Sequence, residues 1–147
     1  MLQTIDAVSG IGFHLDTVLR TIQLAYVQRF REAGVDLSVE QWVFLQRIYN
    51  KGGEAPQREL VRLNFRNKAT TSRLIQGLVK KELLAQKRFE GDRKRFNLVL
   101  SEKGLALVQK LEPIAQELRT QAIAGIDESD WQIFLAILDK VRANYSE

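Results

Sequence analysis

Cysteine is absent from this 147-residue sequence, and histidine occurs once. Without thiols the chain can form no disulfide, thiolate nucleophile or iron–sulfur cluster, and a single imidazole disfavours most transition-metal sites. No apolar run approaches the roughly 18 residues that span a bilayer, and the first residues lack the basic and then apolar pattern of a secretory signal. We therefore expect a cytoplasmic protein that needs no cofactor and no metal and does not enter a membrane.

Acidic residues are scarce in the middle of the sequence. Residues 47–103 hold fifteen Lys or Arg against six Asp or Glu, a net charge of +9. The rest of the chain holds seven basic against twelve acidic residues, a net charge of −5, so the overall charge of +4 conceals a strong division. A basic segment of this kind is typical of a protein that binds a polyanion.

Apolar spacing and capping residues predict six helices and one β-hairpin. The helices are expected at about residues 13–32, 39–50, 56–63 and 68–83, followed by a long helix capped by Ser101 and a last helix capped by Asp127. Ser38 and Asn67 are the expected N-caps of the second and fourth helices. Pro113 lies inside the long helix and should bend it or interrupt its hydrogen bonds. The hairpin strands are expected at residues 84–89 and 96–100, joined by "EGDRKR".

A helix, a short helix, a turn, a further helix and a basic hairpin follow one another in the order of a winged helix-turn-helix. In that arrangement the second helix of the pair enters the major groove of DNA, and the hairpin lies over the flanking backbone or the minor groove. We therefore predict a mainly α-helical fold with a small β-wing.

Four short motifs strengthen this prediction. They are "QRELV" on the first helix of the pair, "KATTSRLI" on the second, "EGDRKR" in the hairpin and "LSEKG" at the start of the next helix. In this order and spacing they resemble the MarR family of bacterial transcriptional regulators. One departure is Glu82, which stands where the family usually has a glycine that ends the recognition helix, so that helix is expected to close differently or to run slightly longer.

The resemblance implies a homodimer that holds two winged domains over a pseudo-palindromic operator. Residues 1–37 would form an N-terminal dimerisation helix, residues 38–100 the DNA-binding region and residues 101–147 the C-terminal dimerisation helices, within one structural domain. Most members of the family are repressors, and many release DNA when a small, often phenolic or lipophilic, ligand binds between the dimerisation and DNA-binding parts. The partners implied are double-stranded DNA, a second copy of the chain and a small-molecule effector.

The predicted DNA contacts lie on the fourth helix and on the hairpin. Arg73 and Gln76 point away from the apolar face of that helix, and Arg73 matches the arginine of the family's motif; arginine can bind guanine or a phosphate. The turn that begins the helix supplies further candidates, which are Asn67, Lys68, Ala69, Thr70, Thr71 and Ser72. Thr71 falls nearer the buried side of the helical wheel, so DNA contact and core packing are weighed equally for it.

Three consecutive basic residues at the hairpin, Arg93, Lys94 and Arg95, cannot all point the same way. Asp92 and Arg93 are expected to hold the tip together, and Lys94 and Arg95 to reach the DNA backbone. The alternative for such a run is a solvated surface. Two aromatic residues, Tyr26 and Trp42, are interpreted as core or dimer-interface side chains, with a ligand pocket as the alternative.

Three classes of function differ in how well they account for these features. A dimeric DNA-binding transcriptional repressor accounts for the basic segment, the winged order and the motifs together. A winged domain that binds an acidic protein partner stays open, because the charge alone would serve both. An enzyme is disfavoured, because the sequence has no glycine-rich phosphate loop and no carboxylate pair in a recognisable setting.

Overall fold

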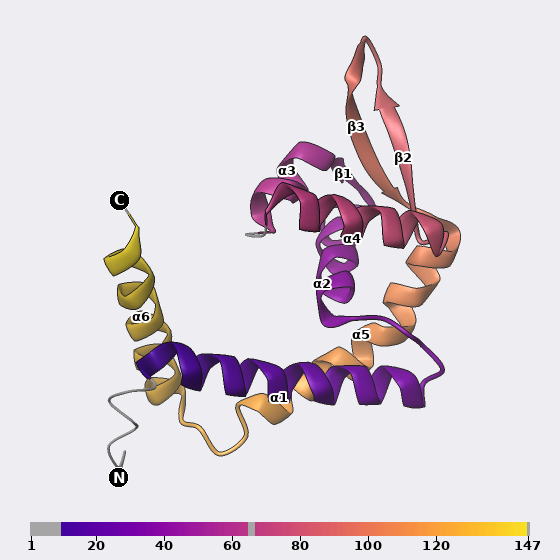
Figure 1. Ribbon diagram of the computed structural model, residues 1–147. Coiled ribbons are helices and arrows are strands. Elements are labelled where there is room, and N and C mark those ends of the chain that lie inside the picture. Colours follow the sequence, from indigo (N-terminus) through magenta and orange to yellow (C-terminus); the bar gives the residue numbers. More distant parts are fainter. Residues whose placement is uncertain (1–9, 65–66, 147) are drawn as a thin grey trace. The chain divides into compact units, whose positions relative to one another are not determined.

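The computed structural model describes residues 10–64 and 67–146 (Figure 1). Within these ranges the helices are α1 (Gly10–Glu32), α2 (Val39–Asn50), α3 (Gln57–Leu63), α4 (Lys68–Lys80), α5 (Glu102–Ala122) and α6 (Glu128–Tyr145), and the strands are β1 (Glu54–Pro56), β2 (Leu84–Phe89) and β3 (Asp92–Leu100). The predicted mainly helical fold with a small wing is confirmed. The chain divides into two compact units, one ending at Ala115 and the other beginning at Gln116.

The predicted caps of α2 and α4 are confirmed. The Ser38 hydroxyl accepts from the Gln41 amide, and the Gln41 side chain accepts from the Ser38 amide, so the first exposed donors of α2 are satisfied. The Asn67 Oδ1 atom accepts from the Thr70 amide at 2.8 Å. Asp127 occupies the N-cap position of α6 as predicted, but its side chain makes no capping hydrogen bond.

Several predicted boundaries were wrong. Helix α1 begins at Gly10, before the expected Phe13, because the glycines there do not prevent helix formation. Pro56 precedes α3 and ends strand β1, which the sequence analysis missed; proline is tolerated there because β1 is an edge strand. Strand β3 begins at Asp92, not at Phe96, so the basic run belongs to a strand. Gly91, at φ +84°, supplies the left-handed backbone that makes this tighter turn feasible.

The sheet is antiparallel with the strand order β1–β3–β2. The central strand β3 pairs Leu98 with Ala55 of β1 on one side and with Gln86 of β2 on the other. Beyond β1, strands β2 and β3 continue as a two-stranded hairpin that projects past the helices (Figure 1). This hairpin is the wing.

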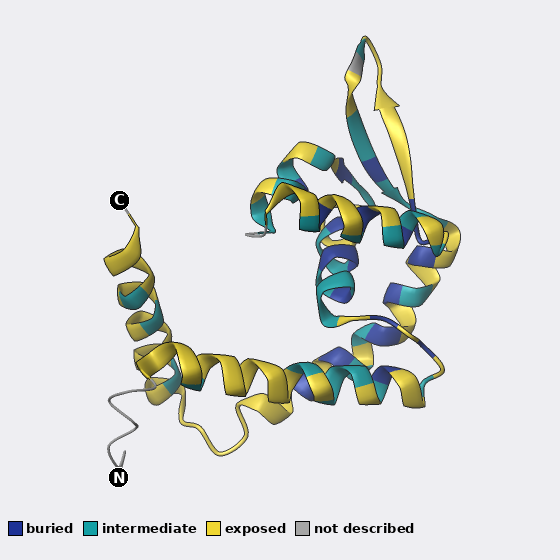
Figure 2. Ribbon diagram, in the orientation of Figure 1, coloured by how far each residue is buried: buried dark blue, intermediate teal, exposed yellow. Residues whose placement is uncertain are grey.

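A single apolar core holds the helix-turn-helix and the base of the wing together. Its fully buried side chains come from α1, α2, α3, α4, β3 and α5, and the larger ones are Phe30, Trp42, Phe44, Leu45, Ile48, Leu60, Ile75, Leu78, Leu98 and Leu111. Figure 2 shows buried residues along α2, on one side of α4 and on α5. Helix α5 continues through Pro113, which has no amide hydrogen to donate within it.

Helix α4 ends at Lys80, three residues before the predicted end. Glu82 takes a left-handed conformation with φ +62°, which for a residue other than glycine costs roughly 1–2 kcal/mol. The Leu83 amide then donates to the Leu78 carbonyl and the Glu82 amide to the Val79 carbonyl, which is a Schellman motif. Glu82 therefore closes the helix as a glycine would, and the expectation of a longer helix was wrong.

The "LSEKG" motif fastens this helix end to α5. The Ser101 hydroxyl donates to the Glu82 carbonyl at 2.6 Å and accepts from the Gly104 amide at 2.9 Å, so it also caps α5 as predicted. A Cβ atom at Gly104 would lie 2.2 Å from the Leu83 carbonyl oxygen. Only glycine lets the first turn of α5 approach the backbone this closely.

We predict that Gly104→Ala will destabilise the fold by about 1–3 kcal/mol, because the new methyl group meets backbone and not a movable side chain. The measurement is thermal or urea unfolding followed by circular dichroism. Gly12→Ala is the matched control, since Gly12 is also helical and a Cβ there meets nothing within 4 Å. Equal stability of the two variants would contradict the packing role of Gly104.

Candidate nucleic-acid interface

Helix α4 has one buried and one exposed side. Thr71, Ile75 and Leu78 are buried in the core. On the opposite side the exposed residues are Lys68, Ala69, Ser72, Arg73, Gln76 and Lys80. Six of the predicted DNA-binding residues are therefore exposed on this helix or at its cap. They are Asn67, Lys68, Ala69, Ser72, Arg73 and Gln76.

Thr71 connects the start of α4 to Asn64 and Asn67. Its hydroxyl donates to the Asn67 carbonyl at 3.1 Å and accepts from the Asn64 side-chain amide at 3.1 Å. Thr71 is fully buried, so the structure gives it the packing position that the sequence analysis weighed against DNA contact. These bonds fix the start of α4, where the amides and the helix dipole favour a negative charge.

Arg73 is oriented along the exposed side of α4 by a neighbour. Its Nη2 atom lies 3.4 Å from the Thr70 hydroxyl oxygen, one helical turn earlier. Thr70 is half-buried, so its hydroxyl is better placed to orient Arg73 than to contact DNA itself. The guanidinium and the Gln76 amide thus stand side by side at helical spacing on the exposed surface, where both can act as hydrogen-bond donors.

The wing carries an ion pair that differs from the expected one. The Asp92 Oδ2 atom lies 3.3 Å from Arg95 Nε, and the Asp92 Oδ1 atom accepts from the Lys94 amide at 2.9 Å. Asp92 does shape the tip, as predicted, but it pairs with Arg95, which had been assigned to DNA. The side chain of Arg93 lies outside the described residues, so its expected pairing with Asp92 stays a prediction.

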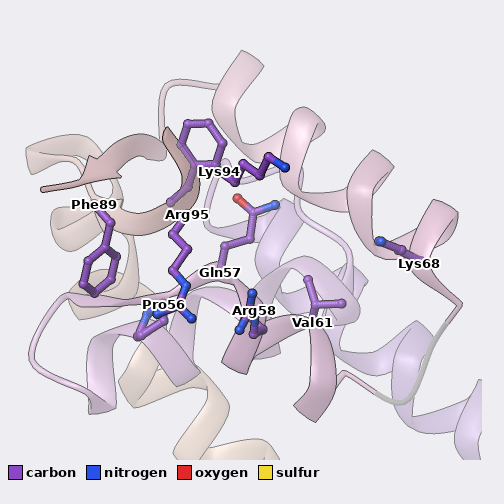
Figure 3. Close-up of a pocket in the computed structure, with 9 residues that line it drawn as sticks. Pro56, Gln57, Arg58, Val61, Lys68, Phe89, Lys94 and Arg95 are labelled. Carbon is purple, nitrogen blue, oxygen red and sulfur yellow. The ribbon is translucent and has the colours of Figure 1, made fainter. Parts of the chain in front are cut away.

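A groove lies between α3, the start of α4 and the wing (Figure 3). Its volume is about 380 Å³, and its lining residues are Pro56, Gln57, Arg58, Val61, Lys68, Phe89, Lys94, Arg95 and Phe96. Four of the nine are cations and none is acidic, so the groove favours anions. Figure 3 shows Arg95 reaching from the wing toward Pro56 at the start of α3.

Arg58 is a groove residue that the sequence analysis did not single out. It follows Gln57 in the "QRELV" motif, and the motif alone does not tell which of its residues faces the wing. Phe89 was also missed, because an aromatic residue at a strand end looks like a core residue; it is 41% exposed and lines the groove.

Side-chain hydrogen bonds hold the wing against the helix pair. The Gln86 amide of β2 donates to the Gln57 carbonyl oxygen of α3 at 2.9 Å. Glu54 of β1 accepts from the Asn97 side chain at 3.1 Å and lies 3.8 Å from the Lys87 ammonium group. Polar contacts at the base of the hairpin thus join the wing to α3 and to β1.

The two aromatic residues considered for a ligand pocket belong to an aromatic row. Tyr26 packs edge-to-face on Phe30 with ring centres 5.8 Å apart, and Phe30 packs on Trp42 at 5.7 Å. Trp42 is buried and Tyr26 is half-buried. This is the core packing named as the first interpretation, and a ligand-lining role for Tyr26 and Trp42 stays a prediction.

The helix pair is also tied to α2 by an ion pair between Lys51 and Glu59. The hydrogen bond and the positive charge of Lys51 lower the pKa of the Glu59 carboxyl from its ordinary value. A carboxyl with a lowered pKa stabilises the folded state above its unfolded pKa, and this contribution is lost as the pH falls through the folded value.

We therefore predict that Glu59→Gln will lower the melting temperature at about pH 7. The difference from the unmodified chain should shrink as the pH falls below the ordinary glutamate pKa, and vanish once the pH is below the lowered pKa of Glu59 in the folded state. Thermal melts at a series of pH values test this. A difference that is the same at all these pH values would show that the charge of Glu59 is not involved.

Other kinds of site find no support in the described residues. Within residues 10–64 and 67–146 no three His, Cys, Asp or Glu side chains are grouped so as to hold a metal ion. Over the same ranges, no helix combines the length and the hydropathy needed to cross a membrane.

The comparisons with known proteins agree with the geometry. A model of the MarR family matches residues 35–95, from just before α2 to the first residues of β3. Over this segment the chain is similar to the MarR family. MarR-family transcription regulators are DNA-binding proteins and not enzymes, which is the class expected from the motifs.

Solved structures of similar chains extend the likeness beyond the matched segment. A probable transcriptional regulator from Pseudomonas aeruginosa is 25% identical, with a TM-score of 0.77 over 90% of this chain and 96% of that chain. The S. aureus MepR–DNA complex is 20% identical, with a TM-score of 0.82 over 91% and 97% of the two chains. BpsR of Bordetella bronchiseptica, whose DNA binding is regulated by 6-hydroxynicotinic acid, is 20% identical, with a TM-score of 0.78 over 95% and 97%. At 20% identity the last two show a shared fold.

Proposed function

We propose that this chain is a member of the MarR family and a cytoplasmic homodimeric repressor that binds a pseudo-palindromic operator and is released by a small molecule. The observation that carries the proposal is the exposed side of α4, which lies beside a groove lined by four cations. A helix with an exposed Arg and Gln fits the major groove, and the adjoining cations fit the flanking phosphates.

Different residues would do different parts of the binding. Arg73 and Gln76 would read base edges, because both can donate to acceptors in the major groove. Lys68, at the start of α4, would bind a phosphate together with Arg58, Lys94 and Arg95 around the groove. Phosphate contacts set the position and the affinity, and base contacts set the sequence preference.

The dimer is proposed from apolar side chains that are exposed on two helices. In α1 these include Phe13, Val18, Leu19 and Leu24, and in α6 they include Ile133, Phe134 and Ile137. A soluble monomer rarely exposes so many large apolar residues along helices, so a second copy is the simplest partner. Residues 1–37 and 101–147 would then form the dimerisation region, and residues 38–100 the DNA-binding region.

Release by an effector is proposed by analogy with BpsR, whose DNA binding is regulated by 6-hydroxynicotinic acid. Tyr26 and Trp42 are the aromatic residues that would lie nearest to a ligand between the dimerisation and DNA-binding regions. Binding there would act on DNA only if the ligand favoured one of two arrangements of the dimer.

Selection of bound duplexes from a random pool tests the function as a whole. A two-fold related motif with half-sites about one helical turn apart is the expected result. Enrichment of no motif, together with binding that falls steeply with salt, would favour the alternative of an acidic protein partner.

We predict that Arg73→Ala will weaken binding to the selected operator by about 1–3 kcal/mol per lost base contact, and will relax the base preference at one position of each half-site. Fluorescence anisotropy with the operator and with single-base variants of it measures both effects. Arg142→Ala, which removes an exposed arginine of α6, is the control and should change neither. An unaltered base preference in Arg73→Ala would rule out base reading by this residue.

We predict a different result for Lys94→Ala. A phosphate contact carries no sequence information, so affinity should fall by the same factor for the operator and for a scrambled duplex. The slope of log affinity against log salt should become shallower by about one. A loss confined to the operator would show that Lys94 reads bases.

A further inference from the structure

One carboxylate stands beside the cationic groove and pairs with a groove residue. The Asp92 Oδ2 atom is 3.3 Å from Arg95 Nε, and the two side chains are 45% and 53% exposed. The other groove cations are Arg58, Lys68 and Lys94, and no Asp or Glu lines the groove. Arg95 therefore pairs with the Asp92 carboxylate of its own chain, and it also lines the groove in which an anion from another molecule would bind.

We propose that Asp92 competes with DNA phosphate for Arg95 and so lowers the affinity of the wing for all DNA. This inference rests on the proposed function, because it assumes that the groove binds the DNA backbone. In the free protein the carboxylate occupies the Arg95 guanidinium. When a phosphate enters the groove, Arg95 exchanges the carboxylate for the phosphate, and the displaced negative charge of Asp92 stays close to the DNA.

The size of the effect follows from the exposure of the pair. Exposed ion pairs of this kind contribute little, so the competition is worth a factor of about two to five in affinity. Both the pairing of Asp92 with Arg95 and its repulsion of the phosphate are screened by salt. The effect should therefore be largest at low salt and shrink as salt is added.

The two carboxylate oxygens of Asp92 have separate tasks, and this allows a clean test. Oδ1 accepts from the Lys94 amide at 2.9 Å and shapes the strand start, whereas Oδ2 faces Arg95. Asp92→Asn keeps an Oδ1 acceptor for the Lys94 amide and removes the charge. Asp139→Asn is the matched control, because Asp139 also pairs with an arginine three residues later, Arg142 at 3.7 Å, and α6 contributes nothing to the groove.

The experiment measures the affinity of the full chain for a selected operator and for a scrambled duplex, at several salt concentrations. Asp92→Asn should bind both duplexes about two- to fivefold more tightly at low salt, with a ratio to the unmodified chain that falls toward one at high salt. Asp139→Asn should bind as the unmodified chain does. In an Arg95→Gln background, Asp92→Asn should improve binding by a smaller factor, because the cation for which the two anions compete is gone and only the repulsion between Asp92 and the phosphate is removed.

Three results would overturn the inference. They are a gain no larger than that of Asp139→Asn, a gain of undiminished size in the Arg95→Gln background, and a loss of affinity in Asp92→Asn while its melting temperature is unchanged. If Asp92→Asn melts at a lower temperature, Asp92→Ser, whose hydroxyl can also accept from the Lys94 amide, takes its place. Failure of the unmodified chain to bind any duplex would instead remove the proposed function.

Discussion

Helix α4 is held in one rotation about its own axis by Thr71, Ile75 and Leu78, which are buried in the core that it shares with α2. Rotation of the helix about its axis would expose these side chains and bury the charge of Arg73. The side of α4 that faces solvent is therefore determined by the burial of the opposite side. The bonds of Thr71 to Asn64 and Asn67 add a fixed starting point. The surface proposed to contact DNA is thus a consequence of core packing.

The groove beside α4 depends on a second set of contacts, which are polar and lie nearer the surface. Gln57 with Gln86, and Glu54 with Asn97, join the wing to segments about thirty to forty residues earlier in the chain. Such bonds are individually worth about 1 kcal/mol, and they add to the β1–β3 pairing and to the burial of Leu98 in the core. The base of the wing is therefore held by apolar and polar contacts together.

The parts of the fold that sequence could predict are those with local causes. Ser38 and Asn67 predicted the starts of their helices correctly, because an N-cap depends only on neighbouring residues. The outward position of Arg73 followed from helical periodicity. Strand β1 could not be predicted, because three residues have no periodicity and are strand only through pairing with β3. The cationic groove likewise brings together Arg58, Lys68 and Arg95 from three elements, and the pairing of Asp92 with Arg95 depends on the conformation of the wing.

The left-handed Glu82 lies where the end of α4 meets the start of α5, two helices that also share the apolar core. Three hydrogen bonds from the start of α5 stabilise this strained conformation. The Glu82 carbonyl accepts from the Ser101 hydroxyl, the Leu83 carbonyl from the Ser101 amide, and the Lys81 carbonyl from the Lys103 ammonium group. If the first turn of α5 withdrew, these acceptors would lose their partners, and the last turn of α4 could fray and release the strain. The conformation of the C-terminal end of α4 therefore depends directly on the position of the first turn of α5, through these three hydrogen bonds.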